Sequence, residues 1–434
     1  MPRAAPDDPM TQTLARPGRR RAARAAAAAL PLALLAACAG TADDAAPASS
    51  ASATTTTAGS PAEAATYQPR IVLTYDGGLL VLDADTLETV DRIEADGFLR
   101  VNAAGDGRHV MVSTDAGFQV LDAGTWAEEH GDHAHYWTAE PALTDVVYAA
   151  EKPGHVVVHD ERVALFDDGT GEVTVLDVHD VAGGDEAVTR THTTPSAHHG
   201  VAVLRTDDSL VVSDGTEEAR TGVRLLDADD TEVAATDACP GVHGEAVAAD
   251  EVVVVGCQDG VVVVGTDTIT KVASPDAYGR IGNQAGTEES PVVLGDYKSD
   301  PDADLERPTR VSLVDTRTAS LRLVDLPASY TFRSLGRGAD GEALVLGTDG
   351  ALHVIDPEAG TLTRSIPLID AWTEPDEWQQ PRPALHVLDG MAYVTDPATN
   401  QVLAVDVASG EVWKTAKLDV TPNEITSAAG RHAH

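Results

Sequence analysis

The stretch that decides the fold is RIVLTYDGGLLVLDADTLETVDRI, at Arg70–Ile93. An apolar run ends in a turn with Asp and Gly, a second apolar run ends in Leu-Asp, and a third strand-like segment follows. Runs rich in Val and Leu between such turns are typical of antiparallel strands. The same order returns at residues 107–125, 161–178, 250–268, 341–362 and 391–412. A repeated hairpin with a further strand predicts the blades of a β-propeller.

The repeats also predict how many blades there are and how the ring closes. The hairpin at Arg70 has no inner strand before it, so we expect the C-terminal segment to supply one and close the ring. We therefore predict a single all-β propeller of eight blades. Seven blades remain the alternative, because residues 278–326 are irregular and contain the insertion YKSDPDADLERPTR. The expected inner strands begin near Phe98, His155, His199, His243, Tyr278, Phe332, His386 and Glu424.

The N-terminus predicts where the protein is sent. Residues 1–37 combine an arginine-rich stretch with a short apolar segment, as in a signal peptide. The segment ends in Leu-Ala-Ala-Cys, which resembles a bacterial lipobox and makes Cys38 the lipidated residue. Residues 38–66 are rich in Ala, Ser and Thr and are expected to form a flexible linker. We predict an extracytoplasmic domain at 67–434, attached to the cell membrane only through its lipid. Ordinary cleavage without a lipid is the alternative.

Charge and cysteine content narrow the function further. The formal net charge of −40 argues against nucleic acid and anionic membrane surfaces as partners and favours cations, although it also fits a solvated acidic surface. Cys239 and Cys257 flank two expected antiparallel strands, so in an exported protein we predict a disulfide between them. A zinc site with these thiolates is the alternative, but their spacing does not suit one. We expect a monomer.

Histidines recur at a fixed interval in front of the expected inner strands. His199 follows His155 by 44 residues, and His243 follows His199 by 44 residues. Inner strands of a propeller line its central channel, so equivalent positions in consecutive blades converge on the axis. Three neutral imidazoles with a carboxylate or water form a good zinc site. His386 has the same phase in the last full blade and is a further candidate. The alternative is that these are polar residues at a channel mouth.

A second histidine cluster lies in EEHGDHAHYW at Glu128–Trp137. His130, His133 and His135 lie among carboxylates in what we expect to be a long loop between blades. A His-x-His loop of this kind predicts a flexible metal-binding segment. A polar surface loop without a metal is the alternative.

Taken together, the lipobox, HGDHAHYWTAEPALTD, HHG, CPGVHGEA and the repeats resemble the AztD-type zinc metallochaperones over about residues 67–434. The resemblance implies a propeller that binds Zn(II) and passes it to the solute-binding protein of an ABC zinc importer. It also implies that His155, His199 and His243 are channel ligands, and that His133 and His135 belong to a mobile acquisition loop. No histidine lies between Cys38 and Arg108, so an acquisition role moves from the N-terminus to residues 130–135.

Catalytic motifs such as G-x-S-x-G, H-E-x-x-H and the Walker A sequence are absent from the sequence. We therefore predict a zinc carrier that is not an enzyme. A protein-binding scaffold and a metal-dependent hydrolase with Glu245 as base are the alternatives. Imidazole ligands do not by themselves distinguish zinc from copper or nickel.

Overall fold

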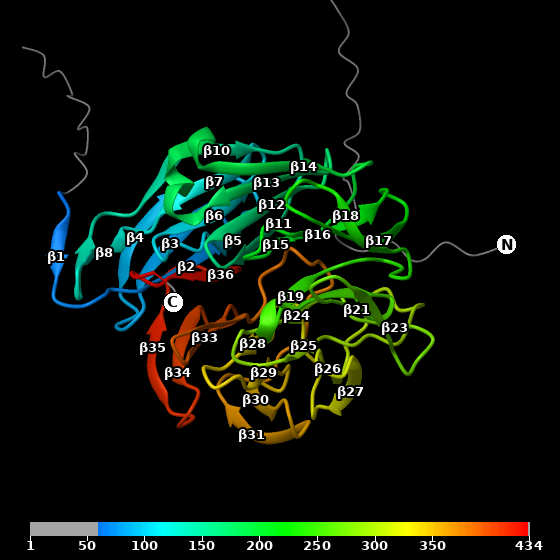
Figure 1. Ribbon diagram of the computed structural model, residues 1–434. Helices are drawn as coiled ribbons and strands as arrows, with labels where there is room; N and C mark the ends of the chain where they lie inside the picture. The colour runs from blue at the N-terminus through cyan, green and yellow to red at the C-terminus, as the bar shows by residue number, and fades with distance from the viewer. Residues whose placement is uncertain (1–59, 433–434) are drawn as a thin grey trace, which may run out of the picture. The chain divides into compact units, whose positions relative to one another are not determined.

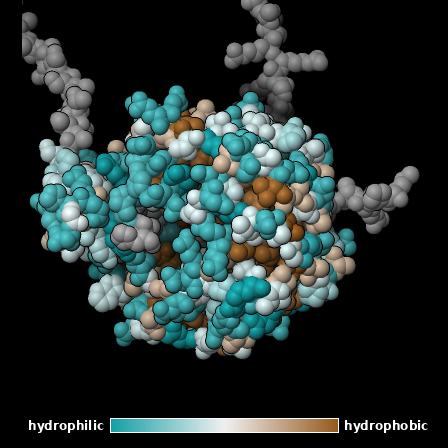
Figure 2. All heavy atoms as spheres, in the orientation of Figure 1, coloured by the Kyte–Doolittle hydropathy of each residue, from teal (hydrophilic) through white to brown (hydrophobic). Residues whose placement is uncertain are grey.

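The computed structural model describes residues 60–432, and the predicted signal peptide and Cys38 lie outside this range. The described part is built from antiparallel sheets, as the all-β prediction requires (Figure 1). Its helices are the short segments η2 (Val178–Ala187) and η3 (Ala249–Glu251), and none of its helices is long and apolar enough to cross a membrane. Hydrophilic side chains predominate on the face shown in Figure 2, with smaller hydrophobic patches between them.

Within residues 60–432, eight sheets each contain four antiparallel strands. The first four sheets, given in spatial order, are β36 (Ile425–Ala428), β2 (Arg70–Tyr75), β3 (Gly78–Asp83) and β4 (Thr89–Glu94); β5 (Arg100–Ala103), β6 (His109–Thr114), β7 (Gly117–Asp122) and β10 (Ala142–Ala149); β11 (Pro153–His159), β12 (Arg162–Asp167), β13 (Glu172–Asp177) and β14 (Val188–Thr193); and β15 (Ala202–Leu204), β16 (Leu210–Gly215), β17 (Arg220–Leu226) and β18 (Glu232–Thr236).

The next four sheets are β19 (Glu245–Val247), β20 (Val253–Cys257), β21 (Asp259–Val264) and β22 (Ile269–Ala273); β24 (Gln284–Ala285), β25 (Val292–Gly295), β26 (Arg310–Asp315) and β27 (Ser320–Asp325); β28 (Leu335–Arg337), β29 (Ala343–Leu346), β30 (Ala351–Asp356) and β31 (Thr361–Pro367); and β32 (Leu385–Leu388), β33 (Met391–Asp396), β34 (Gln401–Asp406) and β35 (Val412–Lys417). A three-stranded sheet joins β1 (Ala62–Ala64), β9 (His133–Thr138) and β8 (Thr125–His130).

The recurrent glycine after each first hairpin turn has a steric cause. Gly78 begins β3, and a Cβ there would lie 2.0 Å from the carbonyl oxygen of Ile93 in β4. Gly117 occupies the same place in the next sheet, where a Cβ would lie 2.2 Å from the carbonyl oxygen of Tyr148. Only glycine leaves room for such a close backbone approach. The recurrent glycine therefore marks a place where the backbones of two neighbouring strands approach closely.

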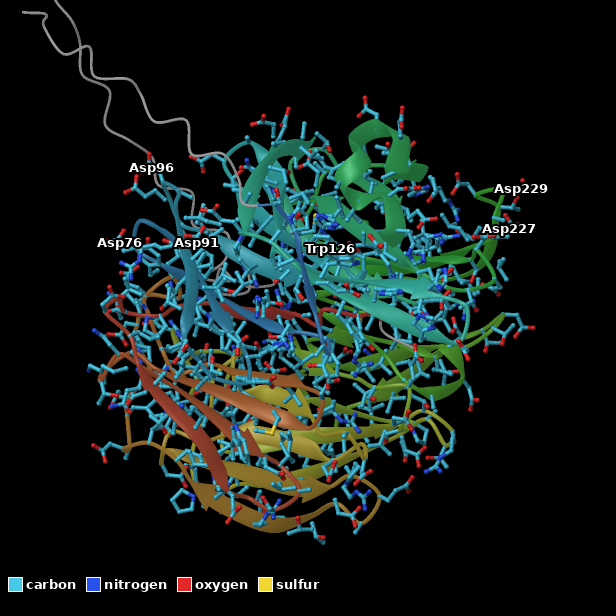
Figure 3. All side chains as sticks on the ribbon, turned by 90° about the vertical axis from the view of Figure 1, so that its left-hand side faces the viewer. Asp76, Asp91, Asp96, Trp126, Asp227 and Asp229 are labelled. Carbon is cyan, nitrogen blue, oxygen red and sulfur yellow. A yellow bond between two sulfur atoms is a disulfide. The ribbon has the colours of Figure 1, made fainter. Side chains whose placement is uncertain are left out.

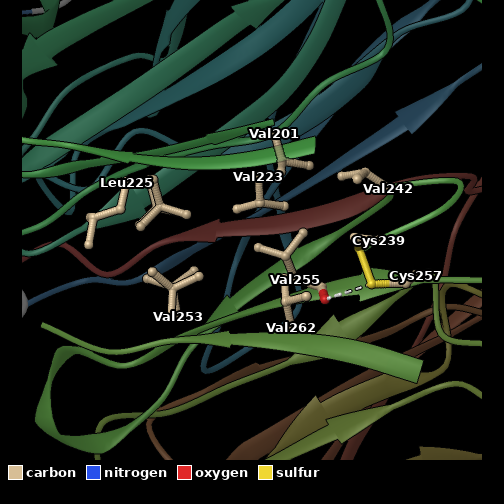
Figure 4. Close-up of a cluster of buried hydrophobic side chains, with 12 residues drawn as sticks. Val201, Val223, Leu225, Cys239, Val242, Val253, Val255, Cys257 and Val262 are labelled. Atoms are coloured by element: carbon tan, nitrogen blue, oxygen red, sulfur yellow. Dashed lines mark hydrogen bonds between the residues drawn. A yellow bond between two sulfur atoms is a disulfide. The ribbon is translucent and has the colours of Figure 1, made fainter. Parts of the chain in front are cut away.

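Buried side chains join each sheet to the next. In Figure 4, Val201 and Val223 of one sheet pack against Val253 and Val262 of the following sheet. Comparable clusters join the other consecutive sheets, and Tyr393 near the C-terminus packs with Leu80 near the N-terminus. Each fully buried Val or Leu contributes about 1.5–3 kcal/mol. The core is therefore distributed between sheets, which fixes their order.

The C-terminal strand β36 pairs with β2 near the start of the described residues (Figure 1). Ala428 lies opposite Arg70, and Ile425 lies opposite Leu73. Just before β36, Glu424 accepts a hydrogen bond from Arg333 at 2.6 Å. The C-terminal segment thus supplies an edge strand of the sheet that holds the first repeat.

Three local expectations need correction. The inner strand expected near Tyr278 begins at Gln284, because β23 (Gly279–Arg280) pairs in parallel with β21 instead. The end of the predicted linker is ordered: Ala62–Ala64 form β1, whose backbone pairs with β9. The expected loop at residues 128–137 lies within the β8–β9 hairpin, which closes in a two-residue turn.

The predicted disulfide between Cys239 and Cys257 is present, with an S–S distance of 2.02 Å. Both cysteines are buried against the valine cluster of Figure 4. The bridge fixes the segment that precedes β19 to the end of β20.

Candidate metal centre

The structure brings His155, His199 and His243 together, and we call these three residues the His triad. His155 is the third residue of β11, and the other two come shortly before β15 and β19. Their ring centroids are 5.1 Å apart for His155 and His199, 5.7 Å for His155 and His243, and 5.0 Å for His199 and His243. One ring nitrogen of each lies within 4.8 Å of the other two. In a tetrahedral zinc site such nitrogens are about 3.3 Å apart, so small side-chain movements suffice.

Each imidazole of the His triad is held through Nδ1. His199 Nδ1 lies 2.5 Å from Asp168 Oδ2, and His155 Nδ1 lies 3.2 Å from Glu245 Oε1. His243 Nδ1 lies 2.5 Å from the carbonyl oxygen of Gly282. Carboxylates and carbonyls accept hydrogen bonds, so each Nδ1–H donates. The neutral rings therefore present the Nε2 lone pair, the arrangement that acceptors around metal-binding histidines enforce.

The glycine after two of these histidines follows from packing. A Cβ at Gly200 would lie 2.1 Å from the ring of Phe166, and the Gly200 N–H donates to Asp168. Gly244 has φ +71°, and a Cβ there would lie 2.3 Å from the same Gly282 carbonyl that holds His243. Glycine tolerates both conditions at little cost. The His-Gly pairs of the sequence therefore let the backbone approach the groups that orient the imidazoles.

Burial makes the His triad electrostatically unusual. His243 is 4% exposed. His199 Nε2 is buried and has no hydrogen-bond partner within residues 60–432, although buried polar atoms are nearly always paired. Burial by itself lowers the pKa of His155, but the charge and hydrogen bond of Glu245 outweigh it and raise the pKa above its ordinary value. A cation at this place would bind the Nε2 lone pair of His199.

The second cluster lies on the β8–β9 hairpin, which we call the His hairpin. One ring nitrogen each of His130, His133 and His135 lies within 4.8 Å of the other two. His135 Nδ1 donates to Glu63 of β1 at 2.7 Å. The first two histidines are exposed. An exposed cluster exchanges a bound ion more readily than a buried one, so the two clusters differ in kind.

Aromatic packing holds the base of the His hairpin. Trp126, which Figure 3 labels, stacks on Trp137 with 6.5 Å between ring centroids. The guanidinium of Arg108 lies 4.1 Å from the Trp126 ring centroid and forms an ion pair with Asp122. These contacts fix the base of the strands that carry the imidazoles.

His386, the remaining predicted ligand, does not join the His triad. Its Nε2 lies 2.8 Å from the hydroxyl of Ser427 in β36, and burial lowers its pKa to about 4. His386 is therefore a neutral imidazole whose Nε2 is hydrogen-bonded to Ser427. Two groups that the sequence did not identify are Asp168 and the Gly282 carbonyl. Asp168 lies in an Asp-Gly turn like others along the chain, and a backbone carbonyl leaves no sequence signal.

No family model matches the chain. The curated zinc chaperone AztD of Citrobacter koseri is 26% identical over 360 residues, which cover 80% of this chain and 82% of that protein. The crystal structure of C. koseri AztD has a TM-score of 0.72 and 23% identity, over 83% of this chain and 98% of that one. Its apo form gives a TM-score of 0.71, with the same identity and coverage.

A more distant structure, the dihydro-heme d1 dehydrogenase NirN in complex with DHE, has a TM-score of 0.54 at 13% identity, over 84% of this chain and 75% of that one. This likeness concerns the fold alone. The AztD relative, by contrast, matches in sequence along most of both chains, and its name describes a chaperone and not an enzyme. The resemblance of this chain to the AztD-type zinc chaperones, which the sequence motifs predict, is thereby confirmed.

Proposed function

We propose that this chain is an extracytoplasmic zinc chaperone that binds Zn(II) through the His triad. It gives the ion to the solute-binding protein of an ABC zinc importer and catalyses no reaction. The observation that carries the proposal is that His155, His199 and His243 converge with every Nδ1 held by an acceptor. The name of the C. koseri relative, zinc chaperone, supports the same conclusion.

Three imidazoles suit a carrier because they leave a coordination position open. Zinc prefers four ligands, and a water or a partner side chain would fill the fourth place. A docked partner would enter at that position and replace the imidazoles one at a time. The ion then passes by ligand exchange and is never released into water. Glu245 and Asp168 hold two of the rings in place throughout, which lowers the reorganisation that each exchange requires.

The His hairpin has a different part in the proposal. His133 and His135, with His130, form an exposed site that collects zinc before the buried triad receives it. The charge and hydrogen bonding of Glu63 support this, because its carboxylate already lies beside His135. His386 stays outside the proposed triad, and its Nε2 is hydrogen-bonded to Ser427.

We also propose that the eight four-stranded sheets are the blades of one propeller, closed where β36 pairs with β2. The hydrophobic clusters between consecutive sheets support this, as does the cluster that joins Tyr393 to Leu80. A signal peptide at 1–37, a lipid on Cys38 and a short linker would place the domain outside the cytoplasm. The disulfide supports an oxidising location.

Competition with a chromophoric zinc chelator tests the proposal. The full chain is compared with a variant that carries alanine at His155, His199 and His243, and with a variant that carries alanine at His130, His133 and His135. We expect the triad variant to lose the tight site and the hairpin variant to keep it. Tight binding that survives in the triad variant would contradict the assignment. Transfer to a zinc-free solute-binding protein is then measured, and it should require the His triad.

A further inference from the structure

A cavity of about 890 Å³ lies beside β11 and β19, two of the three strands whose beginnings carry the His triad. The triad residues stand at or before the starts of β11, β15 and β19. The cavity lining includes the last residues of inner strands, such as His159 and Val247, and also the first residues of β19 and β24, Glu245 and Gln284. β11 and β19 therefore lead from the buried His triad to the open cavity.

One side chain belongs to both sites. Glu245 lines the cavity, and its carboxylate accepts the hydrogen bond from His155 Nδ1. Both side chains are mostly buried, with 17% exposed for His155 and 11% for Glu245. An ion that enters the cavity therefore meets the Glu245 carboxylate directly before it meets the first imidazole of the His triad.

The cavity is negatively charged. Glu161, Glu288 and Glu289 line it and are exposed; we call them the mouth carboxylates. Each basic group of the lining already faces an acidic partner. Arg431 pairs with Asp389 at 2.7 Å, His109 with Asp106 at 2.5 Å, and His159 with Glu251 at 2.9 Å. The mouth carboxylates and Glu245 therefore give the lining an excess of negative charge, which concentrates cations.

Arginine side chains stand at the opposite ends of several inner strands. Arg100 begins β5, Arg333 precedes β28 and Arg382 precedes β32. Arg333 and Arg382 are mostly buried and pair with Glu424 and Glu374. These guanidinium groups and their carboxylate partners stand at the end of the inner strands away from the cavity, where Asp168 also lies beside His199.

The His hairpin stands on the side of the cavity. Arg431, which lines the cavity, lies 5.1 Å from the ring centroid of Tyr67, and this ring packs against Tyr136 of β9. A Cβ at Gly430 would lie 2.7 Å from the hydroxyl of Thr125, the first residue of β8. These contacts connect the base of the His hairpin to the segment that lines the cavity. His179 lies 3.4 Å from Glu161, and its ring lies 5.1 Å from that of His432.

We propose that Zn(II) reaches and leaves the His triad through this cavity, with Glu245 as the positioning residue at its inner end. The inference rests on the zinc-carrier function proposed above and adds the direction of transfer to it. The partner that receives the ion then docks on the face of the cavity and the His hairpin.

Obstruction of the cavity is the direct test. Val158, which lines it and is 37% exposed, and Thr287 are both replaced by tryptophan in the full chain. Val412→Trp with Thr361→Trp, both exposed on outer strands, is the matched control. Stopped-flow mixing with a fluorescent zinc indicator gives association and dissociation rates. We expect the plugged variant to slow both by roughly tenfold with unchanged affinity, because an added indole in a narrow passage must move aside.

A charge test keeps the proposal falsifiable if the plugged variant does not fold. Gln replaces Glu161, Glu288 and Glu289. The control replaces Asp76, Asp96 and Asp229 by Asn; these exposed carboxylates are labelled in Figure 3 and do not line the cavity. We expect association to slow by about tenfold at low salt in the first variant and to stay unchanged in the control. The difference should vanish at high salt.

The outcomes separate the two proposals. If the wild type binds no zinc, or if the triad alanine variant binds it equally well, the proposed function fails. If the wild type binds zinc at the His triad but the plugged and charge variants exchange it at the wild-type rates, only the proposed path is overturned.

Discussion

At the scale of single residues, the affinity of the His triad depends on the groups that hold Nδ1. Asp168 bonds to His199 at 2.5 Å, so Asp168→Asn removes the charge that orients this ring and makes it basic. We expect zinc affinity to fall about 10–100-fold, as for other outer partners of metal ligands. Chelator competition measures the loss, and Asp229→Asn, at an exposed turn, is the control. Equal affinity in the two variants would show that Asp168 does not act on the site.

Glu245 sets the pH range of binding. Burial lowers the pKa of His155, but Glu245 raises it above the ordinary value of 6.5, and a protonated ring cannot bind zinc. When the pH is lowered, zinc affinity should therefore begin to fall before the pH reaches 6.5. In Glu245→Gln burial acts without the opposing charge, so the fall should move to lower pH. Zinc titrations between about pH 5 and 8 test this, and a fall at the same pH in both proteins would argue against it.

At the scale of elements, the disulfide supports the segment that carries His243. The bridge joins Cys239 to Cys257 with a sequence separation of 18, and the His243 N–H donates to Gly256 beside it. Cys239→Ser with Cys257→Ser should lower the free energy of unfolding by about 3 kcal/mol. Urea denaturation measures this. Zinc affinity should fall as well, because the segment loses an anchor. An unchanged denaturation midpoint would show that the valine cluster alone holds this region.

At the scale of the whole molecule, the fold depends on its last strand. β36 completes the sheet of the first repeat, and Glu424 before it bonds to the buried Arg333. A chain that ends at Asp419 should lose its cooperative unfolding transition. A chain that lacks residues 60–66 should keep its transition, because β1 pairs only with β9 at the edge of the His hairpin. Near-ultraviolet circular dichroism during heating distinguishes them. A cooperative transition in the first variant would mean that the sheets are stable without β36.

Much of this architecture could be predicted from the sequence, because turns and apolar runs act locally. The repeat at Arg70–Ile93 identified the hairpins, and the interval of 44 residues placed His155, His199 and His243 at equivalent positions. The remainder depends on contacts between distant segments. Asp168 reaches His199 across 31 residues, and Glu245 reaches His155 across 90. Tyr278 failed as a strand start because its segment pairs with β21, which no local pattern indicates.

His386 shows a related limit. It has the phase of the other strand-start histidines, but phase specifies a position along a strand and not the neighbour that occupies the ring nitrogen. Ser427 lies in β36 and takes Nε2 of His386. The His hairpin shows another limit: its sequence predicted a loop, but the segment forms two paired strands. The Trp126–Trp137 stack and the pairing with β1 make it a sheet, and both depend on residues outside the histidine motif.

The central claim is that the His triad holds the transported ion. Anomalous diffraction at the zinc edge, from crystals of the zinc-loaded protein, tests it most directly. The account predicts a strong anomalous peak within about 2.1 Å of Nε2 of His155, His199 and His243. A peak confined to the His hairpin, or to surface carboxylates, would contradict it, because the triad would then be a set of buried imidazoles with no part in carrying zinc.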